Sequence, residues 1–218
     1  MLLERQIGII GLGKFGLSFG RRVCELGFPV IGVDRDQHKV NRAQDVLTQV
    51  YQTEVISREV LQQLGFHELT HVMVCIGDDV SNSALLGMYL LELGVPELWV
   101  KTATDDHRLL LTRLGVHHPF IPEDMAAEHL AYQLAVPGFI DHLPFDPEVM
   151  IQRLPVTALA GKSLREAALT NTYGVQIIAL RGQAETTFRY VPRADDRFEL
   201  GGELVLLGHR KNLVRIKT

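Results

Sequence analysis

The stretch QIGIIGLGKFG, residues 6–16, decides the fold, because a short β-branched run leads directly into a Gly-x-Gly-x-x-Gly loop. In a dinucleotide-binding unit the first glycine, Gly11, makes a tight turn, and the second, Gly13, lets a phosphate approach the backbone. The third, Gly16, lets helix and strand pack closely. The helix that follows the loop presents a positive amino terminus to an anion. Such a loop is common, so its meaning depends on its surroundings.

The next apolar run, PVIGVD (residues 29–34), ends in Asp34, 18 residues beyond Gly16. A spacing near 20 residues is typical of the carboxylate that accepts hydrogen bonds from ribose hydroxyls. The alternative is a glycine-rich turn followed by an unrelated strand-end carboxylate, but strand, loop, helix and acid in this order favour a nucleotide site. Arg35 would suit a 2′-phosphate, yet beside Asp34 it is more often solvated, and NADP is not inferred.

The residues around this motif alternate between strands and helices as far as about residue 134. The predicted strands are 6–10, 29–34, 50–52, 71–76, 98–100 and 119–121, and the predicted helices are 14–27, 38–46, 57–65, 78–94, 105–115 and 122–134. This order predicts an α/β fold, a Rossmann-like doubly wound parallel sheet over residues 1–136. Prolines then interrupt the pattern, which predicts a linker over 137–148 and a smaller α+β domain over 149–218.

Composition excludes several classes of protein. The chain has 218 residues, a net charge of −4, and 46% hydrophobic residues, so a globular protein without general affinity for nucleic acid is expected. No apolar run reaches the ~20 residues that span a bilayer, and no secretory signal is visible. The cysteines, Cys24 and Cys75, have no disulfide or zinc spacing, which favours a cytoplasmic location.

Acidic residues also follow the fourth predicted strand. Ile76, Gly77 and Asp78 stand at the carboxyl edge of the sheet, where ligands bind in such folds, and they are predicted to contact the nucleotide. Asp79 suits the amino-terminal cap of the next helix better. Lys101 closes the fifth strand at the same edge. Lys14 either reaches a terminal phosphate or is a plain surface lysine, and the residues alone leave both interpretations open.

The segments GLGKFG, VIGVDRD, VMVCIGDDVSNS, LWVKT, LTRLGV and PEDMA, with GKSLREAAL and FELGGELVLLG later, resemble the cytoplasmic regulatory subunits of Trk/Ktr potassium uptake systems, which are built from RCK (KTN) domains. The resemblance covers nearly the whole chain. It implies binding of ATP/ADP or NAD(H), dimers that assemble into a ring, possibly an octamer, and a membrane-embedded potassium-translocating partner. It implies no direct membrane insertion and no catalysis, so no catalytic residues are assigned.

The resemblance also implies residue roles. The phosphates lie on the loop from Gly11 to Gly16, with Lys14 and Phe15 included, and Lys101 lies near the nucleotide. Glu123 resembles a carboxylate that joins Mg²⁺ or another divalent cation in some members, although the spacing leaves Asp124 open for that role. Where the family has a small pair beside the adenosine, this chain has Glu54 and Val55, which puts nucleotide preference in doubt.

Two other classes compete with a regulatory subunit. An NAD-dependent oxidoreductase needs a substrate domain with a positioned acid or base, and the residues after 136 offer no such constellation. A Rossmann-type redox sensor that binds DNA needs a helix-turn-helix or a basic wing, and neither is visible. The sequence therefore favours a non-enzymatic, nucleotide-responsive gating subunit.

Overall fold

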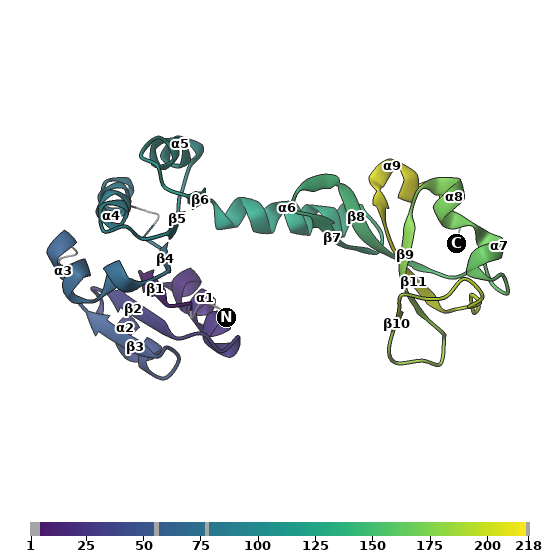
Figure 1. The fold of residues 1–218 in the computed structure, drawn as a ribbon, viewed down its shortest axis with the longest axis horizontal. Coiled ribbons are helices and arrows are strands. Elements are labelled where there is room, and N and C mark those ends of the chain that lie inside the picture. Colours follow the sequence, from purple (N-terminus) through teal and green to yellow (C-terminus); the bar gives the residue numbers. More distant parts are fainter. Residues whose placement is uncertain (1–4, 55–56, 77–78, 217–218) are drawn as a thin grey trace. The chain divides into compact units, whose positions relative to one another are not determined.

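The computed structural model describes residues 5–54, 57–76 and 79–216 and divides the chain into two compact units, residues 1–123 and 124–218. The first unit holds a six-stranded parallel sheet in the order β3-β2-β1-β4-β5-β6 (Figure 1). Its strands are β1 (Ile7–Ile10), β2 (Val30–Asp34), β3 (Gln49–Gln52), β4 (His71–Val74), β5 (Glu97–Lys101) and β6 (His118–Phe120). The predicted Rossmann-like fold is confirmed.

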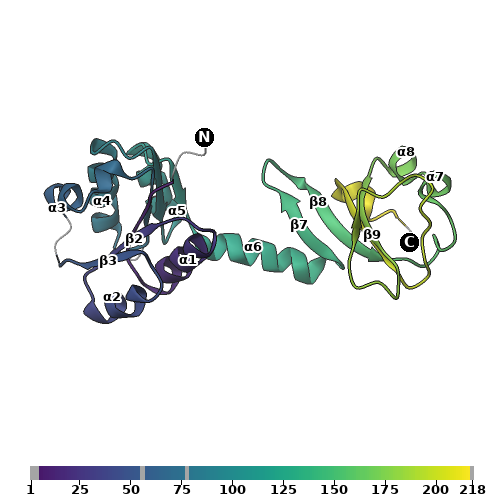
Figure 2. The same ribbon diagram turned by 60° about the horizontal axis from the view of Figure 1, so that its bottom comes forward.

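Helices cover both faces of this sheet, because consecutive strand residues point to opposite sides. On one face α1 (Lys14–Glu25) and α2 (Gln37–Gln44) bury Leu17 and Ala43 against Ile7 and Ile9. The other face is covered by α3 (Arg58–Gln63), the 3₁₀ helix η1 (Phe66–Glu68), α4 (Val80–Glu92) and α5 (Asp105–Arg113). Figure 2 shows α1 and α2 on one side of the strands and α3 and α4 on the other.

The strand order reverses at β1, which has β2 on one side and β4 on the other. Ile10 at the end of β1 pairs with Val33 and with Val74, so the three strands end level with one another. The loops that leave β1 and β4 depart in opposite directions along the sheet and leave a crevice between them. This crevice positions the candidate site.

The second unit contains a five-stranded sheet in the order β10-β9-β11-β8-β7, whose pairs are antiparallel. Its strands are β7 (Phe139–Leu143), β8 (Asp146–Pro155), β9 (Gln176–Arg181), β10 (Arg189–Tyr190) and β11 (Glu203–His209). Three short helices accompany them: α7 (Leu164–Ala167), α8 (Leu169–Tyr173) and α9 (Arg210–Leu213). Ser163 and Glu166 form a capping box at the start of α7. A smaller α+β domain is therefore confirmed.

Residues 137–148, predicted as a linker, instead carry β7 and the first residues of β8. The prolines do not prevent this pairing, because Pro144 lies in the turn between the strands and Pro147 precedes Val149, where β8 starts to pair with β11. The connection between the two sheets is the helix α6 (Pro122–Ala135). Among the described residues, no helix combines the length and apolar character that crossing a bilayer requires.

Candidate functional site

The glycine loop has the backbone that an anion site needs. Gly11 adopts φ +97°, a conformation that favours glycine, and its N–H donates to the carbonyl oxygen of Val33 at 2.8 Å. A Cβ on Gly16 would lie 2.0 Å from the carbonyl oxygen of Gly11, whereas a Cβ on Gly13 would meet no protein atom within 4 Å. Gly16 thus brings helix and loop together, and Gly13 keeps the space beside the loop open.

The amino terminus of α1 has no side-chain cap. Gly13 occupies the cap position and offers no side-chain acceptor, and the first turn holds no acidic residue. The unpaired backbone N–H groups and the positive end of the helix dipole are therefore left available for an anionic ligand. Lys14 is the first residue of the helix and is exposed.

Asp34 ties the end of β2 to the glycine loop. Its carboxylate is 5% exposed, and Oδ2 accepts a hydrogen bond from the backbone N–H of Leu12 at 2.7 Å, while Oδ1 accepts one from the N–H of Asp36 at 2.9 Å. The ammonium of Lys39 lies 3.7 Å from Oδ2. A carboxylate has about four acceptor positions, so Asp34 can hold the loop and still accept ribose hydroxyls.

A cavity of about 350 Å³ lies at this edge of the sheet. Six of the predicted contact residues line it: Gly11, Gly13, Asp34, Arg35, Glu54 and Ile76. The sequence motifs did not predict the remaining lining residues as contacts. These are Val33, Lys39, Cys75, Asp79, Asn82, Leu85 and Leu86. The predicted contacts Val55, Gly77 and Asp78 lie outside the described residues. The cavity combines an apolar wall with a few charged groups, as ligand sites commonly do.

Asp79 both caps α4 and lines the cavity. It caps α4, because its carboxylate accepts from the backbone N–H of Asn82 at 3.0 Å and from the Asn82 side-chain amide at 2.6 Å. The backbone hydrogen bond lowers the pKa of Asp79 most, and the side-chain hydrogen bond from Asn82 lowers it further. It also lines the cavity. The first turn of α4 therefore forms one wall of the site.

Phe15 and Lys101, two predicted contact residues, lie outside the cavity lining. Phe15 is half-buried and packs on Phe19 and Phe120, with ring centroids 6.5 and 5.7 Å away. Lys101 donates from Nζ to Oε1 of Glu123 at 2.8 Å. Burial raises the pKa of Cys75 to about 12, and the positive charge of Lys101 acts in the opposite direction. Neither residue is among those that line the cavity beside Gly13 and Asp34.

Glu123, the predicted metal ligand, is engaged by a cation. Lys101 is hydrogen-bonded to its carboxylate and lowers its pKa. Within residues 5–54, 57–76 and 79–216 no three His, Cys, Asp or Glu side chains are grouped as a metal site would need. A lone carboxylate paired with an ammonium does not fit a divalent cation, which prefers several oxygen ligands.

Comparisons with known proteins identify the two domains of this chain. A family model described as the TrkA-N domain matches residues 7–122, and one described as the TrkA-C domain matches residues 150–217. The Ktr system potassium uptake protein C of Bacillus subtilis (strain 168) is 27% identical over 216 residues, 99% of this chain and 97% of the relative. The Ktr system potassium uptake protein A of Vibrio alginolyticus is 26% identical over 211 residues, covering 96% and 95%.

Two solved structures share the fold over most of this chain. The GsuK RCK domain superposes with a TM-score of 0.53 at 19% identity, covering 97% of this chain and 45% of that chain. The GsuK channel bound to NAD gives a TM-score of 0.51 at 18% identity, covering 96% and 37%. With both domains matched in order, this chain belongs to the family of proteins in which a TrkA-N domain is followed by a TrkA-C domain, as the resemblance to Trk/Ktr regulatory subunits predicted.

Proposed function

We propose that this protein is a nucleotide-binding regulatory subunit that controls potassium flux through a separate membrane protein. The observation that carries the proposal is the cavity in which the open glycine loop and the buried carboxylate of Asp34 meet at the reversal of the strand order. The Ktr relatives are named as potassium uptake proteins, which supplies the transport context.

The ligand class follows from the two ends of the cavity. Phosphate oxygens accept hydrogen bonds from the loop and the amino terminus of α1, and ribose hydroxyls donate to Asp34. ATP, ADP and NAD(H) share these groups, and the GsuK channel has been solved bound to NAD. We therefore assign an adenine nucleotide or NAD(H), with Lys14, Phe15 and Lys101 as contacts made only in the assembled, ligand-bound protein.

Regulation requires that two states of the protein bind the nucleotide differently, because a ligand with equal affinity for both shifts nothing. On the family resemblance, we infer a homodimer that assembles into a ring, possibly an octamer, on the cytoplasmic face of a Trk- or Ktr-type potassium-translocating subunit. The second domain would then dimerise and regulate. The proposed role is not enzymatic: nucleotide is bound and exchanged, and no group is assigned to a chemical step.

Two measurements test the proposal. Isothermal titration of the purified protein with ATP, ADP, NAD⁺ and NADH, each with and without Mg²⁺, should show saturable binding to at least one nucleotide. Potassium flux into vesicles that contain the membrane partner should then depend on this protein and on the nucleotide supplied. Absence of saturable binding, or flux that ignores the nucleotide, would refute the proposal. Steady consumption of NADH with a small substrate would favour an oxidoreductase instead.

A further inference from the structure

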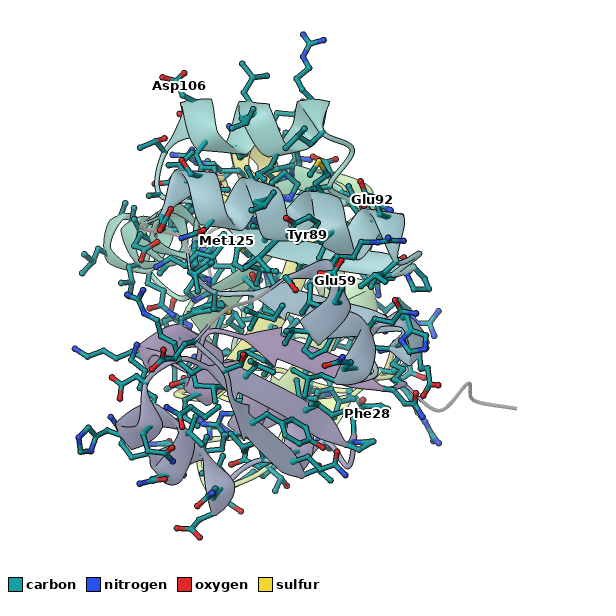
Figure 3. All side chains as sticks on the ribbon, turned by 90° about the vertical axis from the view of Figure 1, so that its left-hand side faces the viewer. Phe28, Glu59, Tyr89, Glu92, Asp106 and Met125 are labelled. Carbon is teal, nitrogen blue, oxygen red and sulfur yellow. The ribbon has the colours of Figure 1, made fainter. Side chains whose placement is uncertain are left out.

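A buried hydrogen bond joins α4 to α5 behind the wall of the cavity. Ser83 of α4 is 0% exposed and His107 of α5 is 2% exposed, and Oγ of Ser83 lies 2.7 Å from Nε2 of His107. Figure 3 shows the two helices side by side, with Asp106 near the start of α5 and Tyr89 toward the far end of α4. The two helices therefore begin at the same end of the layer.

The hydrogen-bond partners assign the histidine's protonation state. The Ser83 hydroxyl carries one proton, and Oγ lies 3.0 Å from the carbonyl oxygen of Val80, to which it donates. Nε2 of His107 must then be the donor to Oγ, which leaves Nδ1 as a bare acceptor. Nδ1 is buried and has no hydrogen-bond partner in the described structure. A second proton there would be a buried, unpartnered charge, so the burial that lowers the pKa of His107 keeps the ring neutral.

This hydrogen bond acts close to the ligand-facing residues. The backbone N–H of Ser83 donates to the carbonyl oxygen of Asp79 at 2.9 Å, within the same helical turn as Asn82, and both Asp79 and Asn82 line the cavity. On the other side, the backbone N–H of His107 donates to Oγ1 of Thr104 at the start of α5. His107 thus ties the cavity-lining turn of α4 to the capped first turn of α5.

We propose that His107 is a positioning residue for the cavity: its Nε2–H holds Ser83, and through Ser83 it holds the first turn of α4 in the arrangement that receives the nucleotide. The inference rests on the proposed function and adds a residue that does not touch the ligand. Losing the bond lets the turn sample other arrangements, and apparent affinity falls by the fraction of protein that stays competent. Because one buried hydrogen bond contributes little net free energy, its loss should lower the apparent affinity by no more than roughly tenfold.

The variants separate the hydrogen bond from packing. His107→Gln keeps a donor nitrogen three bonds from Cβ, as Nε2 is, whereas His107→Leu fills similar space without a donor. Ser83→Ala removes the acceptor. Leu111→Ala is the matched control, because Leu111 is fully buried on the same helix and lies close to Gly87 of α4, beyond the first turn. Each variant is measured by nucleotide titration, by melting temperature, and by amide hydrogen exchange without nucleotide.

We expect His107→Leu and Ser83→Ala to speed exchange at residues 82–85 relative to residues 88–91 by about tenfold, and to raise Kd by up to tenfold. His107→Gln should restore both, and the double variant should be no worse than either single one. Leu111→Ala should lower the melting temperature without these changes. The inference is overturned if His107→Leu leaves the exchange rate at residues 82–85 unchanged, or if Leu111→Ala raises that rate by the same factor. Because exchange is measured without nucleotide, failure of the wild-type protein to bind nucleotide would refute only the proposed function.

Discussion

Replacement of Asp34 by Asn is the most direct test of the site. The substitution preserves the shape of the side chain but removes its charge and replaces one acceptor oxygen with an amide donor. In the wild-type protein one carboxylate oxygen accepts from the N–H of Leu12 and the other from the N–H of Asp36. An amide can accept from only one of them. One backbone N–H therefore faces another donor in a buried position.

The substitution has two separable effects. The unsatisfied N–H costs about 1–3 kcal/mol of folding stability, which should lower the melting temperature by several degrees in a chain of this size. A ribose hydroxyl that donates to a charged carboxylate contributes about 1.5–3 kcal/mol. Losing that bond should raise Kd by roughly ten- to 150-fold. The first effect acts on Asp34 as an anchor of the loop, and the second acts on Asp34 as a ligand-binding group.

Isothermal titration well below the melting temperature measures the binding effect in fully folded protein. Asp36→Asn is the matched control, because Asp36 caps α2 through the N–H of His38 at 2.8 Å and does not line the cavity. The amide oxygen of Asn can still accept this hydrogen bond, so Asp36→Asn removes a carboxylate charge with little loss of stability and should leave Kd unchanged. If Asp34→Asn binds ADP and NADH within twofold of the wild-type protein, Asp34 is only structural and the site assignment is wrong.

Three further predictions concern the glycine loop, the Lys101–Glu123 ion pair and the Cys75 thiol. Gly13→Ala should keep the wild-type melting temperature, because the added Cβ meets no protein atom. It should weaken nucleotide binding at least tenfold, because the Cβ fills the space proposed for a phosphate. Gly16→Ala should lower the melting temperature, because its Cβ would lie 2.0 Å from a backbone oxygen. Glu123→Gln should destabilise the protein by less than about 1 kcal/mol at pH 7. Because Lys101 lowers the pKa of Glu123 below 4.5, this difference is present above pH 4.5 and should disappear from thermal melts as the pH falls through the lowered pKa. Cys75, whose pKa is raised to about 12 by partial burial, should resist iodoacetamide in native protein at pH 8 and react once unfolded, as judged by mass spectrometry; equally fast labelling in the native state would contradict the raised pKa.

Local motifs predicted the fold and the phosphate and ribose ends of the site because each depends on a few neighbouring residues. Gly11 needs a left-handed backbone and Gly16 needs space against the loop, and both needs follow from the strand–loop–helix order. Phe15 shares that loop, yet its side chain turns into a cluster with Phe19 and Phe120. The motif specifies the backbone of the loop, and packing decides where its larger side chains point.

Part of the cavity wall could not be predicted from local sequence motifs. Lys39 belongs to no quoted motif, and Asn82 belongs to the segment VMVCIGDDVSNS, which assigned it no contact. They meet the site because α2 and α4 start near the ends of β2 and β4. Predicting them requires the relative placement of two helices on opposite faces of the sheet. The linker prediction failed for a related reason. Proline excludes a strand only where a backbone N–H must pair, and pairing partners become known only when the sheet is assembled.

The two walls of the cavity differ in how firmly they are held before any ligand arrives. At the glycine loop, Asp34 satisfies two backbone donors, and the close approach of Gly16 to Gly11 leaves no room for a side chain at position 16. Under the proposed function, a nucleotide bound there would cost little ordering and would distinguish poorly between two states of the protein. The first turn of α4 is exposed on its ligand side and is tied from behind by the Ser83–His107 hydrogen bond. Since a nucleotide switches a protein only through contacts that differ between states, the proposed function requires such a contact, and this turn suits that role better than the loop does.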